Sequence, residues 1–158
     1  MLNPISLAFK KAKKEKRPAL LTYTVAGDSS KKQSLEILKA ISNYADILEV
    51  GIPHNTPVAD GGQIQTSAYR AIKNGIKMND VFKIVKNFKK SKYSKPVILM
   101  GYYNPIHYYG NLKFIKKAVL SGIDGLIIVD LPMEEDEEFY NLSYKNNLPL
   151  IRIFKRCF

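Results

Sequence analysis

Residues 96–100 read Pro-Val-Ile-Leu-Met, and residues 125–129 read Gly-Leu-Ile-Ile-Val. Both runs are apolar throughout instead of alternating between apolar and polar residues. Short runs of this kind are typical of strands in a parallel sheet that is covered on both faces. Further strands are expected at 19–25, 47–50 and 148–154.

The segments between these strands carry apolar residues at helical spacing. Helices are expected at 5–16, 31–43, 63–74, from 79 or 80, from 111, and at 134–146. The acidic run 134–138 is expected to form the first turn of the last helix, where carboxylates meet the positive end of the helix dipole. The tyrosine-rich segment 102–109 is expected to be a loop. The alternation of strands and helices predicts an α/β fold built from βαβ units.

The length and charge of the chain limit the possible classes of protein. The 158 residues fit a single domain over 1–158. The formal net charge is +11, but only Arg17, Arg70, Arg152 and Arg156 are arginines among the 25 positive residues. Because base readout favours arginine and the lysines are scattered, the charge indicates a solvated surface, with a basic nucleic-acid-binding α/β module as the weaker alternative.

Membrane and metal roles are not expected from the sequence. No run of 18 apolar residues occurs and the lysine-rich start does not resemble a signal peptide, which predicts a cytoplasmic protein that does not bind a membrane. The single Cys157, together with His54 and His107, leaves little for a zinc site. We therefore expect no metal.

Polar residues collect where the expected strands end, at Asp28, Asp60, Tyr102, Asn104 and Asp130. Ligands bind at the carboxyl ends of strands both in doubly wound sheets and in (β/α)8 barrels. No glycine-rich nucleotide-binding motif is present. Strand count alone favours the open sheet, because a barrel usually needs about 250 residues, but the residues at the strand ends favour the barrel.

Glu49 lies inside the apolar run 47–50. A carboxylate on such a strand is costly unless it is partnered or has a catalytic role. Partial burial would raise its pKa toward the range useful for general acid–base catalysis. The alternative is a structural carboxylate that accepts hydrogen bonds from backbone N–H groups.

Six short segments resemble the tryptophan synthase alpha chain family in their order and spacing. They are Tyr-Thr-Val-Ala-Gly-Asp at 23–28, Leu-Glu-Val-Gly-Ile-Pro at 48–53, Pro-Val-Ala-Asp-Gly at 57–61, Ile-Gln at 64–65, Leu-Met-Gly-Tyr-Tyr-Asn-Pro at 99–105 and Val-Asp-Leu-Pro at 129–132. The resemblance covers about residues 5–151. It implies a parallel (β/α)8 TIM barrel, of which this chain holds about the first five β/α units. It also implies a lyase that cleaves indole-3-glycerol phosphate to indole and glyceraldehyde 3-phosphate.

The resemblance implies a role for each matching residue. Glu49 would be the general acid–base, and Asp60 would accept the hydrogen bond of the indole N–H. The substrate-binding positions would be Tyr23, Tyr102, Asn104 and Asp130. The family docks on a beta chain in an alpha2-beta2 tetramer, and the docking loop would contain Pro53, His54, Asn55, Thr56 and Pro57. Pyridoxal phosphate would belong to that partner, with no cofactor in this chain.

The sequence departs from the family in the docking loop and at its end. His54-Asn55-Thr56 replaces an aromatic residue followed by Ser-Asp, and Gly62 replaces a proline. Residues 152–158 form an atypical tail, and about three strands of a full barrel, with the loops that hold the substrate phosphate, are expected to be missing. A truncated or frame-shifted reading of a longer protein is therefore expected, and a catalytically inactive barrel fragment is the alternative function.

Overall fold

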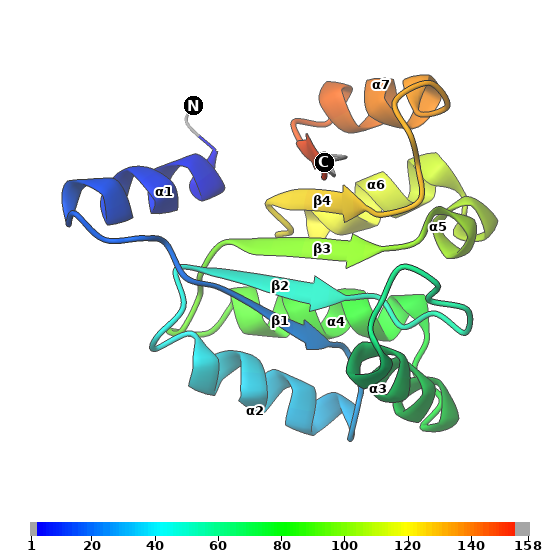
Figure 1. The fold of residues 1–158 in the computed structure, drawn as a ribbon, viewed down its shortest axis with the longest axis horizontal. Helices are drawn as coiled ribbons and strands as arrows, with labels where there is room; N and C mark the ends of the chain where they lie inside the picture. The colour runs from blue at the N-terminus through cyan, green and yellow to red at the C-terminus, as the bar shows by residue number, and fades with distance from the viewer. Residues whose placement is uncertain (1–2, 154–158) are drawn as a thin grey trace.

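The computed structural model describes residues 3–153. Its centre is a parallel sheet with the strand order β1-β2-β3-β4-β5 (Figure 1). The strands are β1 Leu21–Val25, β2 Ile47–Gly51, β3 Val97–Gly101, β4 Gly125–Ile128 and β5 Leu150–Ile151. Because sequential strands are neighbours throughout, the sheet has no point at which the strand order reverses. This is the order of a (β/α) barrel and not of a doubly wound sheet.

Seven helices surround the described sheet. They are α1 Pro4–Lys14, α2 Lys31–Ile41, α3 Gly62–Lys73, α4 Met78–Lys89, α5 Tyr103–Tyr109, α6 Asn111–Leu120 and α7 Glu137–Lys145. No helix among residues 3–153 is long and apolar enough to cross a membrane.

Each face of the sheet packs against different helices. One face contributes Leu48, Leu99 and Leu126 to the main core, where they pack with Phe88 of α4 and Phe114 of α6. On the other face, α1 packs its Ile5 against a row of three isoleucines, Ile47, Ile98 and Ile127. Helix α1 therefore covers the inner face near the amino-terminal ends of the strands, as its amphipathic pattern predicts.

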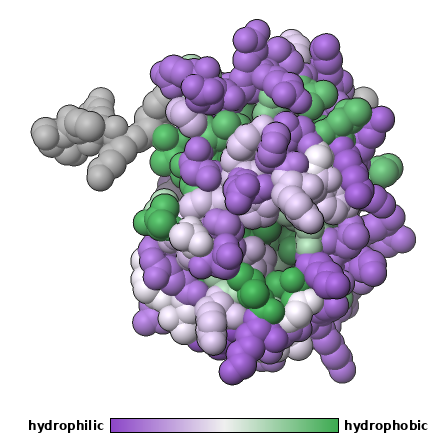
Figure 2. All heavy atoms as spheres, turned by 90° about the vertical axis from the view of Figure 1, so that its right-hand side faces the viewer, coloured by the Kyte–Doolittle hydropathy of each residue, from purple (hydrophilic) through white to green (hydrophobic). Residues whose placement is uncertain are grey.

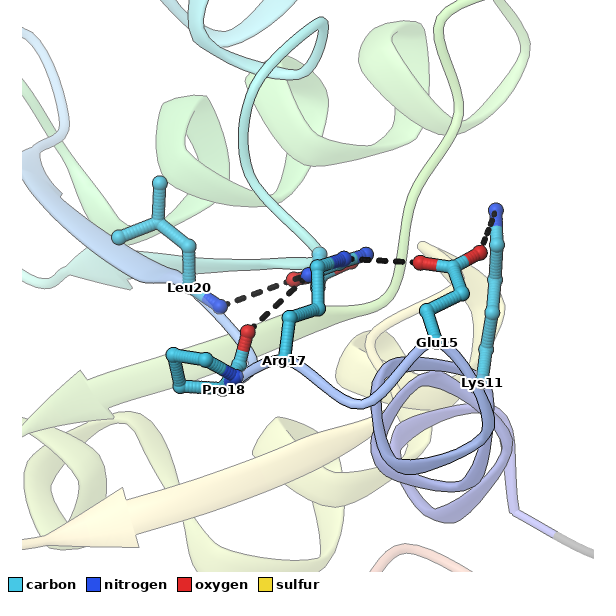
Figure 3. A network of polar contacts seen from close by, with 6 residues as sticks. Lys11, Glu15, Arg17, Pro18 and Leu20 are labelled. Atoms are coloured by element: carbon cyan, nitrogen blue, oxygen red, sulfur yellow. Dashed lines mark hydrogen bonds and ion pairs between the residues drawn. The ribbon is translucent and has the colours of Figure 1, made fainter.

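A carboxylate placed just before β2 fixes the start of β1 through Arg17 and Leu20, both of which Figure 3 shows. Asp46 accepts two hydrogen bonds from the Arg17 guanidinium, at 2.6 and 2.7 Å, and a third from the Leu20 backbone N–H at 2.9 Å. Arg17 holds the pKa of Asp46 well below its usual range. Asp124, just before β4, accepts the Val97 N–H and the Lys89 ammonium in the same way, both at 2.8 Å.

The segment 102–109 forms helix α5, so the expectation of a loop there is wrong. The Asp130 carboxylate accepts the Tyr103 N–H at 2.7 Å and satisfies a free donor of the first turn. Pro105 is tolerated because it also lies in the first turn, and Ile106 is fully buried. Gly110 ends the helix with a φ of 95°. The pairing with Asp130, 27 residues away, is invisible to a local pattern.

The last helix and strand are also shorter than expected. Helix α7 begins at Glu137 and not at Glu134, because Asp136 turns inward, is 3% exposed, and accepts a hydrogen bond from Arg152 Nε at 3.0 Å. Strand β5 covers only Leu150–Ile151 of the expected 148–154. Phe154 and Cys157 lie outside the described residues.

Candidate active site

Glu49 lies in the middle of β2, on the inner face of the sheet. Its neighbours in register are Tyr23 on β1 and Ile98 on β3. The side chain is half-buried, and this burial raises the pKa of the Glu49 carboxyl above its usual value. A carboxyl whose pKa is raised is better suited to take up a proton and pass it on than a carboxyl at the usual pKa.

The Tyr23 hydroxyl lies over the backbone of Gly51. A Cβ atom at position 51 would come within 2.1 Å of the Tyr23 hydroxyl oxygen, so a residue with a side chain would displace the ring. Burial raises the pKa of Tyr23, and the nearby carboxylates of Asp60 and Glu49 raise it further. Tyr23 therefore lies near both carboxylates, the one from β2 and the one from the loop after it.

Asp60 is held in place by Tyr102, which is 5% exposed. The Tyr102 hydroxyl donates to Asp60 Oδ2 at 3.1 Å and accepts the Ala59 N–H at 2.9 Å. The Gln65 side chain donates to the Asp60 carbonyl oxygen at 2.9 Å. The loop that carries Asp60 is therefore tied to the residue that follows β3 and to α3.

Replacing Tyr102 with Phe is expected to release the loop around Asp60. The Ala59 N–H would lose its acceptor, and a hydrogen bond worth about 0.5–1.5 kcal/mol corresponds to roughly 2- to 12-fold faster amide exchange. Hydrogen exchange of the chain measured at Ala59 checks this. Tyr103→Phe is the matched control, because the Tyr103 hydroxyl accepts from Asn111 instead. Equal exchange at Ala59 in wild type and Tyr102→Phe would contradict the role of the hydroxyl.

The other expected substrate residues lie at the same end of the sheet but differ in their contacts. Asp130 is exposed and accepts the Tyr103 N–H, so its carboxylate positions α5. Asn104 is exposed in the first turn of α5. Figure 2 views this end of the molecule, where hydrophilic side chains cover most of the surface and hydrophobic patches lie between them.

Within the expected docking loop, His54 and Pro57 contact the site, and the Pro57 carbonyl oxygen accepts the Asp60 N–H at 3.0 Å. The ring of His54 lies 4.9 Å from the ring of Tyr102, centroid to centroid. Asn55 and Thr56 are exposed, and Pro53 and Pro57 are half-buried. Movement of this loop would therefore shift the ring of Tyr102, whose hydroxyl donates a hydrogen bond to Asp60.

Sequence reasoning assigned no role to Gly51 or to Gln65, although both lie within the quoted motifs. Gly51 leaves the space that the Tyr23 hydroxyl occupies, and Gln65 supports the backbone of Asp60.

Asp28, also at a strand end, forms a bidentate pair with Arg70 on α3 at 2.6 and 2.9 Å. Arg70 lowers the pKa of Asp28, which indicates a structural carboxylate. Residues 3–153 contain no cluster of three or more His, Cys, Asp or Glu that could hold a metal ion.

A sequential parallel sheet with a carboxylate site at the carboxyl ends of its strands defines a protein of the (β/α) barrel class. The family model of the tryptophan synthase alpha chain matches residues 9–157. The chain belongs to this family. It is 68% identical over 149 residues to the tryptophan synthase alpha chain of Pelagibacter ubique (strain HTCC1062), covering 94% of this chain and 56% of that relative.

Solved structures agree with this assignment. Tryptophan synthase subunit alpha from Legionella pneumophila is 39% identical with a TM-score of 0.86, over 95% of this chain and 58% of that one. A chain of the tryptophan synthase a2b2 complex from Pyrococcus furiosus is 42% identical with a TM-score of 0.82, over 85% and 57%. The chain thus spans a little over half the length of the relatives it matches, and it has the TIM-barrel topology over that part.

Proposed function

We propose that this chain carries the catalytic carboxylates of a lyase that cleaves indole-3-glycerol phosphate into indole and glyceraldehyde 3-phosphate. The observation that supports this most is that Glu49, on the inner face of β2, and Asp60, on the loop after β2, both lie near Tyr23. Glu49 is the neighbour of Tyr23 in register, and both carboxylates raise the pKa of Tyr23. Two carboxylates with different surroundings suit a reaction that needs both an acid–base and a charge stabiliser.

The retro-aldol step divides between these two groups. Glu49, with its pKa raised by burial, exchanges the protons that the reaction moves: one is added to indole C3 and one leaves the glycerol hydroxyl. The electron pair of the broken carbon–carbon bond returns to the indole ring, and the hydroxyl carbon becomes the aldehyde. Asp60 accepts the hydrogen bond of the indole N–H while positive charge develops at that nitrogen.

The neighbouring tyrosines support these roles. Tyr23 would form one wall of the indole pocket, and its raised pKa keeps the phenol neutral beside the carboxylates. Tyr102 fixes the direction of the Asp60 carboxylate through its hydroxyl. A fixed acceptor stabilises developing charge better than a mobile one, because no reorganisation is needed during the reaction.

We further propose that the loop at 53–57 docks on a beta chain, as part of an alpha2-beta2 assembly. Support comes from the exposure of Asn55 and Thr56 and from the likeness to a chain of the Pyrococcus furiosus a2b2 complex. Pyridoxal phosphate would belong to the beta chain. Because His54 contacts Tyr102, and Tyr102 hydrogen-bonds Asp60, docking of the loop would change the position of the Asp60 carboxylate.

The test is indole release from indole-3-glycerol phosphate, with and without a beta chain. Two proteins are compared: the 158-residue chain, and a fusion that extends it with the carboxyl-terminal remainder of the Pelagibacter ubique relative. The proposal is supported if either of the two proteins releases indole and if Glu49→Gln abolishes that release. A folded fusion without turnover would mean that this segment is a catalytically inactive barrel fragment.

A further inference from the structure

A groove of about 900 Å³ lies on the outer surface beside α6, bounded by the end of α5 and by α7. Its lining includes Leu112 and Leu120 of α6 and Leu142 of α7. Leu120 is 69% exposed and Leu112 is 45% exposed. Large apolar side chains that are exposed in a concave surface mark interaction sites.

The helices that form the walls of the groove are anchored in the main core by their buried side chains. Phe114 and Ile115 of α6 and Phe139 of α7 are all at most 1% exposed in the main core. At the α5 end, the Tyr109 hydroxyl donates to Asn79 at 2.6 Å. A partner would therefore meet a preformed surface and would not have to order it.

The rim of the groove is positively charged. Lys113, Lys116 and Lys117 line it, and α6 contains no acidic residue. None of these three lysines has an ion pair within the described part of the chain. Lys113 lies over the ring of Tyr109 at 4.6 Å, which holds its ammonium at the end of the groove. Glu138 is the one carboxylate among the lining residues.

We propose that this groove binds an acidic amphipathic helix of a partner protein. Leucine-type residues on one face of that helix would pack on Leu112, Leu120 and Leu142, and flanking carboxylates would meet the three lysines. Helix α6 has 10 residues and is about 15 Å long, so it matches three turns of a partner helix.

Charge argues against two other occupants. A second copy of this chain that docked with the same groove would bring the same lysine rim to the contact, so like charges would face each other, and the net charge of +11 opposes the approach of two copies. A nucleic acid would use the lysines but not the leucines, and the lining has no arginine to stack on bases. The groove shares no residue with the carboxylate site, so helix binding and catalysis can fail independently.

Fluorescence anisotropy with the 158-residue chain tests the proposal. The probe is a labelled peptide of about 12 residues, with leucines at i, i+3, i+4 and i+7 and glutamates between them. We expect a Kd on the order of 10 μM. A peptide of the same composition with alternating leucine and glutamate should bind at least about tenfold more weakly, because its leucines do not share one helical face. Equal binding of the two peptides would overturn the proposal.

Variants then locate the contact. Lys116→Glu combined with Lys117→Glu should weaken binding by about tenfold or more. The pair Lys86→Glu and Lys90→Glu, at exposed positions on α4 and at its C-cap, should change binding less than about twofold. Leu120→Ser leaves the charge unaltered and should weaken binding by about fivefold. Equal effects of the two lysine pairs, or no effect of Leu120→Ser, would overturn the site. Tighter binding of a single-stranded oligonucleotide, lost equally in both pairs, would assign the surface to nucleic acid instead.

Discussion

Glu49→Gln is expected to lower the rate of indole release by about 10²–10⁴-fold, the usual contribution of a positioned general acid–base. Glutamine keeps the size and hydrogen-bonding shape of the side chain but cannot exchange a proton. The effect should therefore appear in kcat, with KM nearly unchanged. Steady-state kinetics of the fused barrel described above measure it.

The matched control is Glu36→Gln. Glu36 is an exposed glutamate on α2 that pairs with Lys39, so its loss removes the same charge far from the site. Activity should stay within about twofold of wild type, as for other exposed surface changes. A Glu49→Gln barrel with wild-type kcat would show that another group moves the protons.

Glu49 should also make the stability of the chain depend on pH. Its contribution should fall as the pH rises, whereas that of most carboxylates, whose folded pKa is lowered, falls as the pH drops. The pKa of Glu49 in the folded chain is raised above the unfolded value of about 4.3. The stabilisation of the protonated form is thus fully present below about pH 4 and is lost as the pH rises through the folded pKa. Thermal melts should show Glu49→Gln more stable than wild type at neutral pH, with a difference that shrinks toward pH 4. A difference independent of pH would contradict the raised pKa.

Asp46→Ala is expected to destabilise the chain by about 2–3 kcal/mol. The substitution leaves the Leu20 N–H without its acceptor and removes both acceptors of the Arg17 guanidinium. Most of this comes from the Leu20 N–H, since a hydrogen bond to a charged group is worth about 1.5–3 kcal/mol, whereas solvent weakens the pair with Arg17, whose side chain is 40% exposed. For a chain of this size the melting temperature should fall by about 5–10 °C.

Glu15→Ala is the control, because Glu15 is the other, more exposed carboxylate on Arg17 (Figure 3). It should cost less than about 0.5 kcal/mol. The Asp46 contribution also depends on pH, since Arg17 holds the Asp46 pKa below the unfolded value of about 3.9. It is present above that value and is lost as the pH falls through the folded pKa. Asp46→Ala and wild type should converge in acid, and a constant gap would contradict the ion pair.

The sequence was sufficient to predict the order of the described strands and of every described helix except α5. Continuous apolar runs such as 97–101 and helical spacing such as that of 78–89 are local patterns, and each was found within a few residues of its predicted place. The prediction of a loop at 102–109 was wrong because the helix found there depends on Asp130, which lies on a different strand-to-helix connection. Inward pairing of Asp136 with Arg152 likewise shortened the last helix.

For the candidate site, the sequence identified the carboxylates but not their environment. The position of Glu49 within an apolar strand indicated a buried carboxyl, and the structure places it half-buried with a raised pKa. The catalytic roles of Glu49 and Asp60 remain proposals. The bond from Tyr102 to Asp60 spans 42 residues, so no spacing within one element could have revealed it.

What the sequence determined by itself was the α/β alternation, the family and the residues that meet at the strand ends, because periodicity and motif order are properties of the chain. Only the tertiary structure decided that Gly51 makes room for the Tyr23 hydroxyl and that Tyr102 holds Asp60, whereas the sequential strand order confirmed the barrel that the resemblance implied. These features depend on the register of neighbouring strands and on distances between segments far apart in the chain. Such distances are set by packing of the whole core, and no local pattern of residues encodes them.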